Sequence, residues 1–99
     1  MAEIEEILQH AMEGYAVEGL NGHGYLTRTQ DGSLFTVIYI GQVRDRTVVD
    51  TGLVARIEGE NIILERDTNN KPLVDALVQA GVPREQIVLA YAGERVETA

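Results

Sequence analysis

The sequence predicts an α+β protein: an antiparallel β-sheet of about five strands with two helices packed on it, in the order α-β-β-β-β-α-β. Three observations lead to this prediction. Residues 4–15 carry apolar side chains at helical spacing, residues 25–66 contain four β-rich runs separated by turn sequences, and residues 73–80 return to helical spacing. The short hairpin-type links between the β-rich runs favour antiparallel pairing, because parallel strands need a longer crossover.

The length and composition describe a single small domain. Residues 1–99 are enough for one hydrophobic core but not for two. The absence of cysteine excludes disulfides, thiol nucleophiles and cysteine-ligated metals. No apolar run is long enough to cross a bilayer, and the N-terminal sequence MAEIEE is acidic where a secretory signal would be basic. We therefore expect a cytoplasmic protein that has no contact with a membrane.

The first helix is expected to cover residues 3–17. Its first turn carries Glu3, Glu5 and Glu6, which have the favourable charge for a helix N-terminus. Its apolar stripe follows an i, i+3, i+4, i+7 pattern and consists of Ile4, Ile7, Leu8, Ala11, Met12 and Tyr15.

The strands are expected at Tyr25–Thr29, Leu34–Val43, Arg46–Ile57 and Ile62–Arg66. Between them lie turn sequences at residues 30–33, 44–45 and 58–61. Gly32 suits the first of these turns because glycine tolerates positive φ. Gly52 lies inside the third run and predicts a bend or a bulge there.

The second helix follows the fourth strand. Asn69 or Asn70 is expected to cap it, with Pro72 in its first turn, where a missing N–H costs little. Its buried stripe consists of Leu73, Ala76, Leu77 and Ala80.

The end of this helix is marked by the sequence LVQAGVPREQIVLAY. Gly81 is expected at the position after the C-cap, with positive φ, and Pro83 prevents the helix from continuing. After a polar turn at residues 84–86, Ile87–Tyr91 is expected to form the fifth strand.

The second β-rich run is apolar on both of its faces. Side chains alternate along a strand, so Phe35, Val37 and Tyr39 point to one face and Leu34, Ile38 and Ile40 to the other. Two helices can cover only one face of such a sheet. The other face must be covered by curling of the sheet, by the long neighbouring strand or by another subunit. We expect a homodimer or a constitutive partner. The expected interaction surface comprises Val37, Ile38, Tyr39 and Ile40 together with Glu3 and Glu6.

No residue pattern predicts a catalytic, cofactor-binding or metal site. His10 lies opposite the apolar stripe of the first helix, where a solvated pair with Glu6 is expected. His23 is placed in the loop before the first strand, without the spacing of a metal ligand set. Ser33 is the only serine and occupies a turn without the context of a nucleophile. We therefore expect that the protein is not an enzyme.

Two further groups of residues have a structural explanation. Gly19, Gly22 and Gly24 follow a helix, whereas a phosphate-binding loop precedes one, so loop flexibility is the expected reason for them. The residues at the end of the fourth run match no calcium loop and are expected to cap the next helix; these are Glu65, Asp67, Asn69 and Asn70.

The net charge of −8 restricts the partners that the chain can bind. Sixteen acidic residues stand against eight basic ones, so the molecule repels phosphate backbones at long range. The only lysine is Lys71, and the seven arginines are scattered. A basic protein surface is the natural complement, although such a charge also serves solubility alone.

Residues 31–91 carry a recognisable combination of motifs. A helix ends in L-V-x-A-G-V-P, a charged turn with Glu85 follows, and the chain continues as I-V-L-A-Y; Gly41 and the Asp67–Thr68 pair add to the pattern. In these respects the chain resembles the XisI family of fdxN-element excision controlling factors. It differs where the family commonly has tryptophan, here Gln42, and after Tyr91, where it lacks the family's His-Pro-Pro segment.

This resemblance implies a small α+β accessory protein for the programmed excision of a DNA element during heterocyst differentiation. It implies no catalytic residue, because the recombinase is another protein, and it suggests a nuclease-like companion, XisH. We expect a non-enzymatic regulator that binds an XisH-like partner and contacts DNA at most indirectly. The alternative is a direct DNA-binding accessory factor, which would need one surface that gathers Arg44, Arg46, Arg56, Arg66 and Arg84.

Overall fold

The computed structural model describes residues 3–95 and contains two α-helices and one five-stranded sheet. The helices are α1 (Ile4–Glu13) and α2 (Leu73–Gln79). The strands are β1 (Gly22–Arg28), β2 (Leu34–Val43), β3 (Arg46–Glu58), β4 (Asn61–Asp67) and β5 (Ile87–Leu89), with 3-10 turns η1 (Arg84–Gln86) and η2 (Ala90–Ala92) flanking β5. The predicted α+β class and the order α-β-β-β-β-α-β are confirmed.

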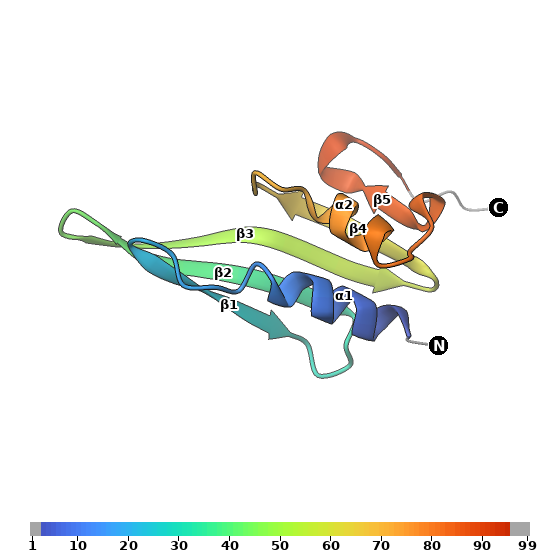
Figure 1. The fold of residues 1–99 in the computed structure, drawn as a ribbon, viewed down its shortest axis with the longest axis horizontal. Helices are drawn as coiled ribbons and strands as arrows, with labels where there is room; N and C mark the ends of the chain where they lie inside the picture. Colours follow the sequence, from blue (N-terminus) through green and yellow to red (C-terminus); the bar gives the residue numbers. More distant parts are fainter. Residues whose placement is uncertain (1–2, 96–99) are drawn as a thin grey trace.

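The strands lie in the sheet in the same order as in the chain (Figure 1). Strands β1 to β4 pair antiparallel, as predicted, but β5 pairs parallel to β4. The reason is α2, which carries the chain back along the sheet so that β5 begins at the same end as β4. The sheet is therefore mostly, not wholly, antiparallel.

Both helices cover the same face of the sheet (Figure 1). Leu8 and Met12 of α1 and Leu77 of α2 are fully buried there. They pack with the inward side chains of the three central strands, namely Phe35, Val37, Leu53, Ala55, Ile62 and Leu64. Burial of this one face is the main source of stability, and no helix within residues 3–95 lies on the other face of β1 to β3.

Helix α1 ends at Glu13, four residues before the predicted end. The chain then runs along the outer edge of β1, where Gly24 N donates to Val17 O at 3.0 Å and Gly19 N donates to Gly22 O at 2.8 Å. These bonds cover part of an edge that would otherwise expose its backbone groups. The helix is therefore about one turn shorter than predicted, and the apolar pattern of the sequence does not show this.

Strand β1 begins at Gly22, so His23 lies in the strand and not in a preceding loop. The interpretation of the glycines as flexible loop residues is wrong for two of them. A Cβ on Gly22 would lie 2.5 Å from the Cα of Gly41, and one on Gly24 would lie 2.9 Å from the carbonyl oxygen of Tyr15. These two glycines allow close backbone approach.

The predicted irregularity at Gly52 is confirmed as a bulge. The β2–β3 register passes from Val37 opposite Leu53 to Ile38 opposite Thr51, which leaves Gly52 without a partner on β2. The carbonyl oxygen of Gly52 instead accepts from the backbone N–H of Thr68 at 3.0 Å. The bulge therefore ties β3 to the segment that leads into α2.

The expectation that Asn69 or Asn70 caps α2 is wrong, whereas Asp67, which is also among the residues expected to cap it, does cap it. Neither asparagine caps the helix; Pro72 is the N-cap residue, one position before the first turn. The Asp67 carboxylate accepts from the Leu73 N–H at 2.7 Å and from the Asn69 N–H at 3.0 Å. A carboxylate six residues upstream can cap the helix because Pro72 is extended and turns the chain back toward it.

The end of α2 is as predicted. Gly81 has φ of +102° and donates to Val78 O at 3.0 Å, while Val82 N donates to Leu77 O at 3.0 Å. This is the hydrogen-bond pattern of a Schellman motif. Strand β5 is shorter than expected and stops at Leu89, because the chain turns into η2.

The β1–β2 turn contains a carboxylate whose ionisation stabilises the fold. Asp31 Oδ1 accepts from Thr29 Oγ1 at 2.6 Å and from the Ser33 hydroxyl at 2.7 Å. The Thr29 hydrogen bond, followed by those from Ser33, lowers the pKa of Asp31 from 3.8 to about 2. Because this pKa is lower in the folded chain, the stabilisation is complete above pH 3.8 and is lost as the pH falls through about 2.

We therefore expect Asp31→Asn to lower the melting temperature at pH 7 and to have a progressively smaller effect between pH 4 and pH 2, the interval set by the two pKa values. Thermal unfolding followed by circular dichroism measures the difference, and an NMR titration of the carboxyl carbon measures the pKa directly. A wild-type Asp31 that titrates near 3.8 would contradict the prediction.

Candidate functional site

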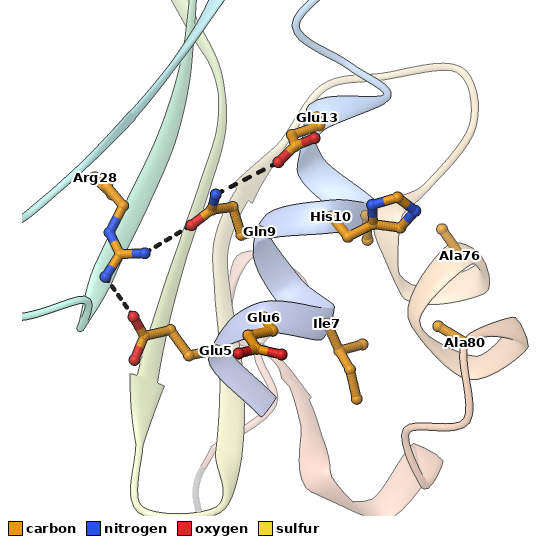
Figure 2. Close-up of a pocket in the computed structure, with 10 residues that line it drawn as sticks. Glu5, Glu6, Ile7, Gln9, His10, Glu13, Arg28, Ala76 and Ala80 are labelled. Carbon is orange, nitrogen blue, oxygen red and sulfur yellow. Dashed lines mark hydrogen bonds and ion pairs between the residues drawn. The ribbon is translucent and has the colours of Figure 1, made fainter. Parts of the chain in front are cut away.

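A shallow groove of about 630 Å³ lies against the outer side of α1 (Figure 2). Part of its lining is apolar and comes from both helices, namely Ile7 of α1 and Ala76 and Ala80 at α2. Carboxylates from the exposed side of α1 also line it, at Glu5, Glu6 and Glu13. The surface thus combines apolar contact area with negative charge. We call it the acidic groove.

One side of the acidic groove is fixed by Arg28 of β1 (Figure 2). Its guanidinium pairs with the Glu5 carboxylate and donates to Gln9 Oε1 at 2.6 Å. It also lies 5.1 Å from the centroid of the Phe35 ring. Glu5 is therefore used within the fold, whereas Glu6 forms no ion pair within residues 3–95.

The residues predicted for an interaction surface do not form one surface. Glu3 and Glu6 are exposed at the start of α1. Val37 is 6% exposed and lies in the core beneath the helices, so it is not available to a partner. Ile40, at 41% exposed, lies on the opposite face of the sheet together with the half-buried Ile38.

Tyr39 is half-buried and lies on the face of β2 that the helices cover further along. Its ring packs over the paired glycines Gly22 and Gly41, where a Cβ on Gly41 would lie 2.7 Å from a ring carbon. Tyr39 therefore fills the space above these glycines and is a structural residue at this end of the sheet.

The face away from the helices exposes apolar residues that sequence reasoning missed. Tyr25 lies opposite Ile38, and Val49 lies opposite Ile40. Tyr25 is 49% exposed and Val49 66% exposed. Tyr25 comes from β1 and Val49 from β3, whereas the predicted Ile38 and Ile40 come from β2. Only the strand register therefore shows that these side chains are neighbours.

The arginines do not gather on one surface. Arg56 donates to Glu65 at 2.6 Å and to Glu58 at 2.8 Å, and these hydrogen bonds raise its pKa. Arg84 pairs with Glu94 at 2.9 Å. Arg66 approaches Asp50 at 3.7 Å, and Arg44 and Arg46 lie at the far tip of the β2–β3 hairpin (Figure 1).

Among the described residues, neither histidine lies in an arrangement suited to catalysis or to metal binding. His10 is exposed on α1 and forms no ion pair with Glu6 in the part of the chain that the structure describes. The ring of His23 packs against that of Tyr25 at a centroid distance of 4.7 Å. Within residues 3–95 there is no group of three or more His, Cys, Asp or Glu side chains suited to hold a metal ion, and no polar side chain is fully buried.

Comparison with known proteins identifies the family. The family model described as XisI protein matches residues 2–98. The chain belongs to the XisI family. The resemblance based on the motif LVQAGVPREQIVLAY is thereby confirmed. No curated protein is similar enough in sequence to count as a match.

Solved structures share the fold of this XisI-family chain. A XisI-like protein from Anabaena variabilis ATCC 29413 matches with a TM-score of 0.74 and 22% identity, over 86% of this chain and 81% of that chain. The fdxN element excision controlling factor XisI from Anabaena variabilis ATCC 29413 matches with a TM-score of 0.59 and 21% identity, over 88% and 83%. At these identities the similarity establishes the fold.

Two further observations on this XisI-family chain concern Gln42 and the two helices. Gln42, at the position where the family commonly has tryptophan, is exposed and donates to Thr47 Oγ1 at 3.2 Å. Neither helix in residues 3–95 has the length and apolar character that a membrane-spanning helix requires.

Proposed function

We propose that this chain is a non-catalytic accessory factor that controls the excision of a DNA element by binding an XisH-like partner protein. Membership of the XisI family supports this proposal, as does the fold shared with a protein described as an fdxN element excision controlling factor. In this role the protein works in the cytoplasm, beside the DNA and the recombinase, and leaves the chemistry of strand exchange to that enzyme.

The observation that carries the proposal is the distribution of charge. Arg28, Arg56 and Arg84 are paired with carboxylates of the same chain, so they contribute little positive field to the surface. The net charge of −8 is then presented to partners, and it is combined with apolar contact area in the acidic groove. Such a surface favours a basic protein segment, which it attracts at long range and holds by apolar contact.

The partner would lie along α1. Glu6 and Glu13 line the groove and are both exposed, and Glu3 precedes them as the N-cap residue of α1. A basic amphipathic helix placed there would set its apolar side chains against Ile7 and Ala80 and its lysines or arginines against these carboxylates.

The proposal is tested by co-purification and titration calorimetry with an XisH-like protein from the same organism. We expect binding at micromolar concentration and a roughly 10-fold loss of affinity for Glu6→Lys, since reversal of a charge in an interface costs on the order of 1–2 kcal/mol. Asp45→Lys is the matched control, because it makes the same charge change at the hairpin tip, and it should bind normally. The absence of wild-type binding at micromolar concentration would overturn the proposal.

The DNA-binding alternative has a different expected result. Its five arginines do not share one surface, since Arg44 and Arg46 lie at the hairpin tip and the other three are engaged in ion pairs elsewhere. We therefore expect no mobility shift of element-end DNA by this chain alone at low salt. A shift that weakens steeply with salt would instead favour direct DNA binding.

A further inference from the structure

The sheet face away from the helices carries an apolar patch on three adjacent strands. We call it the β-face patch and define it as Tyr25, Thr27, Ile38, Ile40, Val49 and Thr51. The register places these side chains on one face, and the Thr27 hydroxyl is hydrogen-bonded to that of Thr36 across the strands. No helix of residues 3–95 lies on this side of β1 to β3 (Figure 1).

The β-face patch is uncharged in a chain that has 24 charged residues. Of the residues that border it on the same face, His23, Thr36 and Val54 are uncharged, whereas Glu18 opposite His23 and Arg66 opposite Val54 place one charge at each outer edge. Strand alternation keeps Asp50 off this face, since Asp50 is opposite Tyr39 and thus belongs to the other face. Charges on this side of β2 and β3 begin only at Arg56.

We propose that the occupant of the β-face patch is a second copy of this chain, so that two sheets pack face to face about a two-fold axis. Two molecules of charge −8 repel each other, and this repulsion is smallest where they meet through uncharged surfaces. A strongly charged partner gains no ion pair from the six residues of the patch itself, whereas a second copy brings the same apolar and threonine side chains. A symmetric pair requires such a self-complementary patch.

A stable dimer through the β-face patch would also cover the parts of β1, β2 and β3 that surround it. A standard interface buries about 800 Å² per partner, which is on the order of one eighth of the 6755 Å² surface of this chain. The ten residues of β2 extend over about 34 Å, and β1 and β3 flank it on either side. Aligned packing of two such faces is the arrangement found in β-sandwiches.

The dimer leaves the acidic groove open, because α1 and α2 lie on the other face of the sheet (Figure 1). One dimer would then present two grooves. The inference therefore stands independently of the proposed XisH-like partner, and each can fail without the other.

Sedimentation equilibrium of the full chain tests the dimer. We expect a dimer at about 10 μM for the wild type and a dissociation constant about 30-fold higher for Val49→Glu, because each copy would bring a carboxylate into an apolar interface. Val43→Glu is the matched control. It makes the same change at an exposed valine of the same hairpin, on the opposite face, and should remain dimeric.

Circular dichroism establishes that each variant is folded, and Ile40→Lys replaces Val49→Glu if the latter does not fold. A wild-type chain that stays monomeric at about 100 μM would overturn the inference. So would a folded Val49→Glu variant that dimerises as well as the wild type, or equal dissociation of Val43→Glu and Val49→Glu.

Discussion

Replacement of Phe35 by alanine is expected to lower the free energy of unfolding by about 3–5 kcal/mol. Phe35 has no exposed surface and is the largest fully buried side chain in residues 3–95. It lies opposite Ala55 of β3 and Arg28 of β1. Because Ala55 is small, the Phe35 ring fills the space between the sheet and the helices at this point. Truncation leaves a cavity and also removes the cation–π partner of the Arg28 guanidinium.

Urea unfolding followed by circular dichroism measures this loss. Phe35→Leu keeps most of the volume and should cost less than about 1.5 kcal/mol. Val43→Ala lies on the exposed part of the same strand and should change stability by less than about 0.5 kcal/mol. A loss below about 1.5 kcal/mol for Phe35→Ala would show that the surrounding core collapses into the space.

Gly22→Ala is expected to destabilise the protein by about 2–3 kcal/mol. An added Cβ would lie 2.5 Å from both the Cα of Gly41 and the carbonyl oxygen of Ile40, and neither backbone atom can rotate away. The methyl group would also lie 2.6 Å from the Tyr39 hydroxyl oxygen. β1 must therefore separate from β2 at this end or shift along it.

Gly52→Ala is the matched control for this prediction. Its Cβ would meet only Thr68 Oγ1 at 3.4 Å, so stability should change by less than about 0.5 kcal/mol. Urea unfolding gives the two values, and amide hydrogen exchange of His23 and Tyr25 reports whether the start of β1 has opened. Equal losses for the two variants would contradict the close-approach explanation.

The parts of the fold that depend on local sequence could be predicted. The alternation of β2, the bulge at Gly52 and the helix end at Gly81 each follow from a few neighbouring residues and appear as expected. Side-chain periodicity and the requirement for a positive φ are both determined by residues that are close together in the sequence. Such features need no knowledge of the tertiary contacts.

The parts of the fold that depend on distant residues could not be predicted from the sequence. Helix α1 stops early because Val17 and Gly19 bond to β1, and Gly22 is required by Gly41 on another strand. Asp67 is one of several residues expected to cap α2, and only the structure shows that it does so, from six residues away, in place of the nearer Asn69 and Asn70. Each of these outcomes is decided by a partner that sequence spacing does not identify.

The same distinction applies to the candidate surfaces. Ile38 and Ile40 follow from alternation within β2, but alternation alone does not tell which face the helices cover, and so Val37 was assigned to the surface although it is buried. Tyr25 and Val49 join the patch only through the strand register. The acidic groove needs Ala76 and Ala80 beside α1, which is a tertiary contact between the two helices.

The order of the strands in the sheet also has a consequence for how the chain folds. Every strand pairs with the next strand along the chain, and only the β4–β5 pair needs an intervening helix. Little loop entropy is lost before each pairing forms, so the contact order is low for a sheet protein and folding should be fast. The hairpins β1–β2 and β2–β3 can form while the C-terminal part of the chain is still being synthesised, and β5 completes the sheet once α2 has docked.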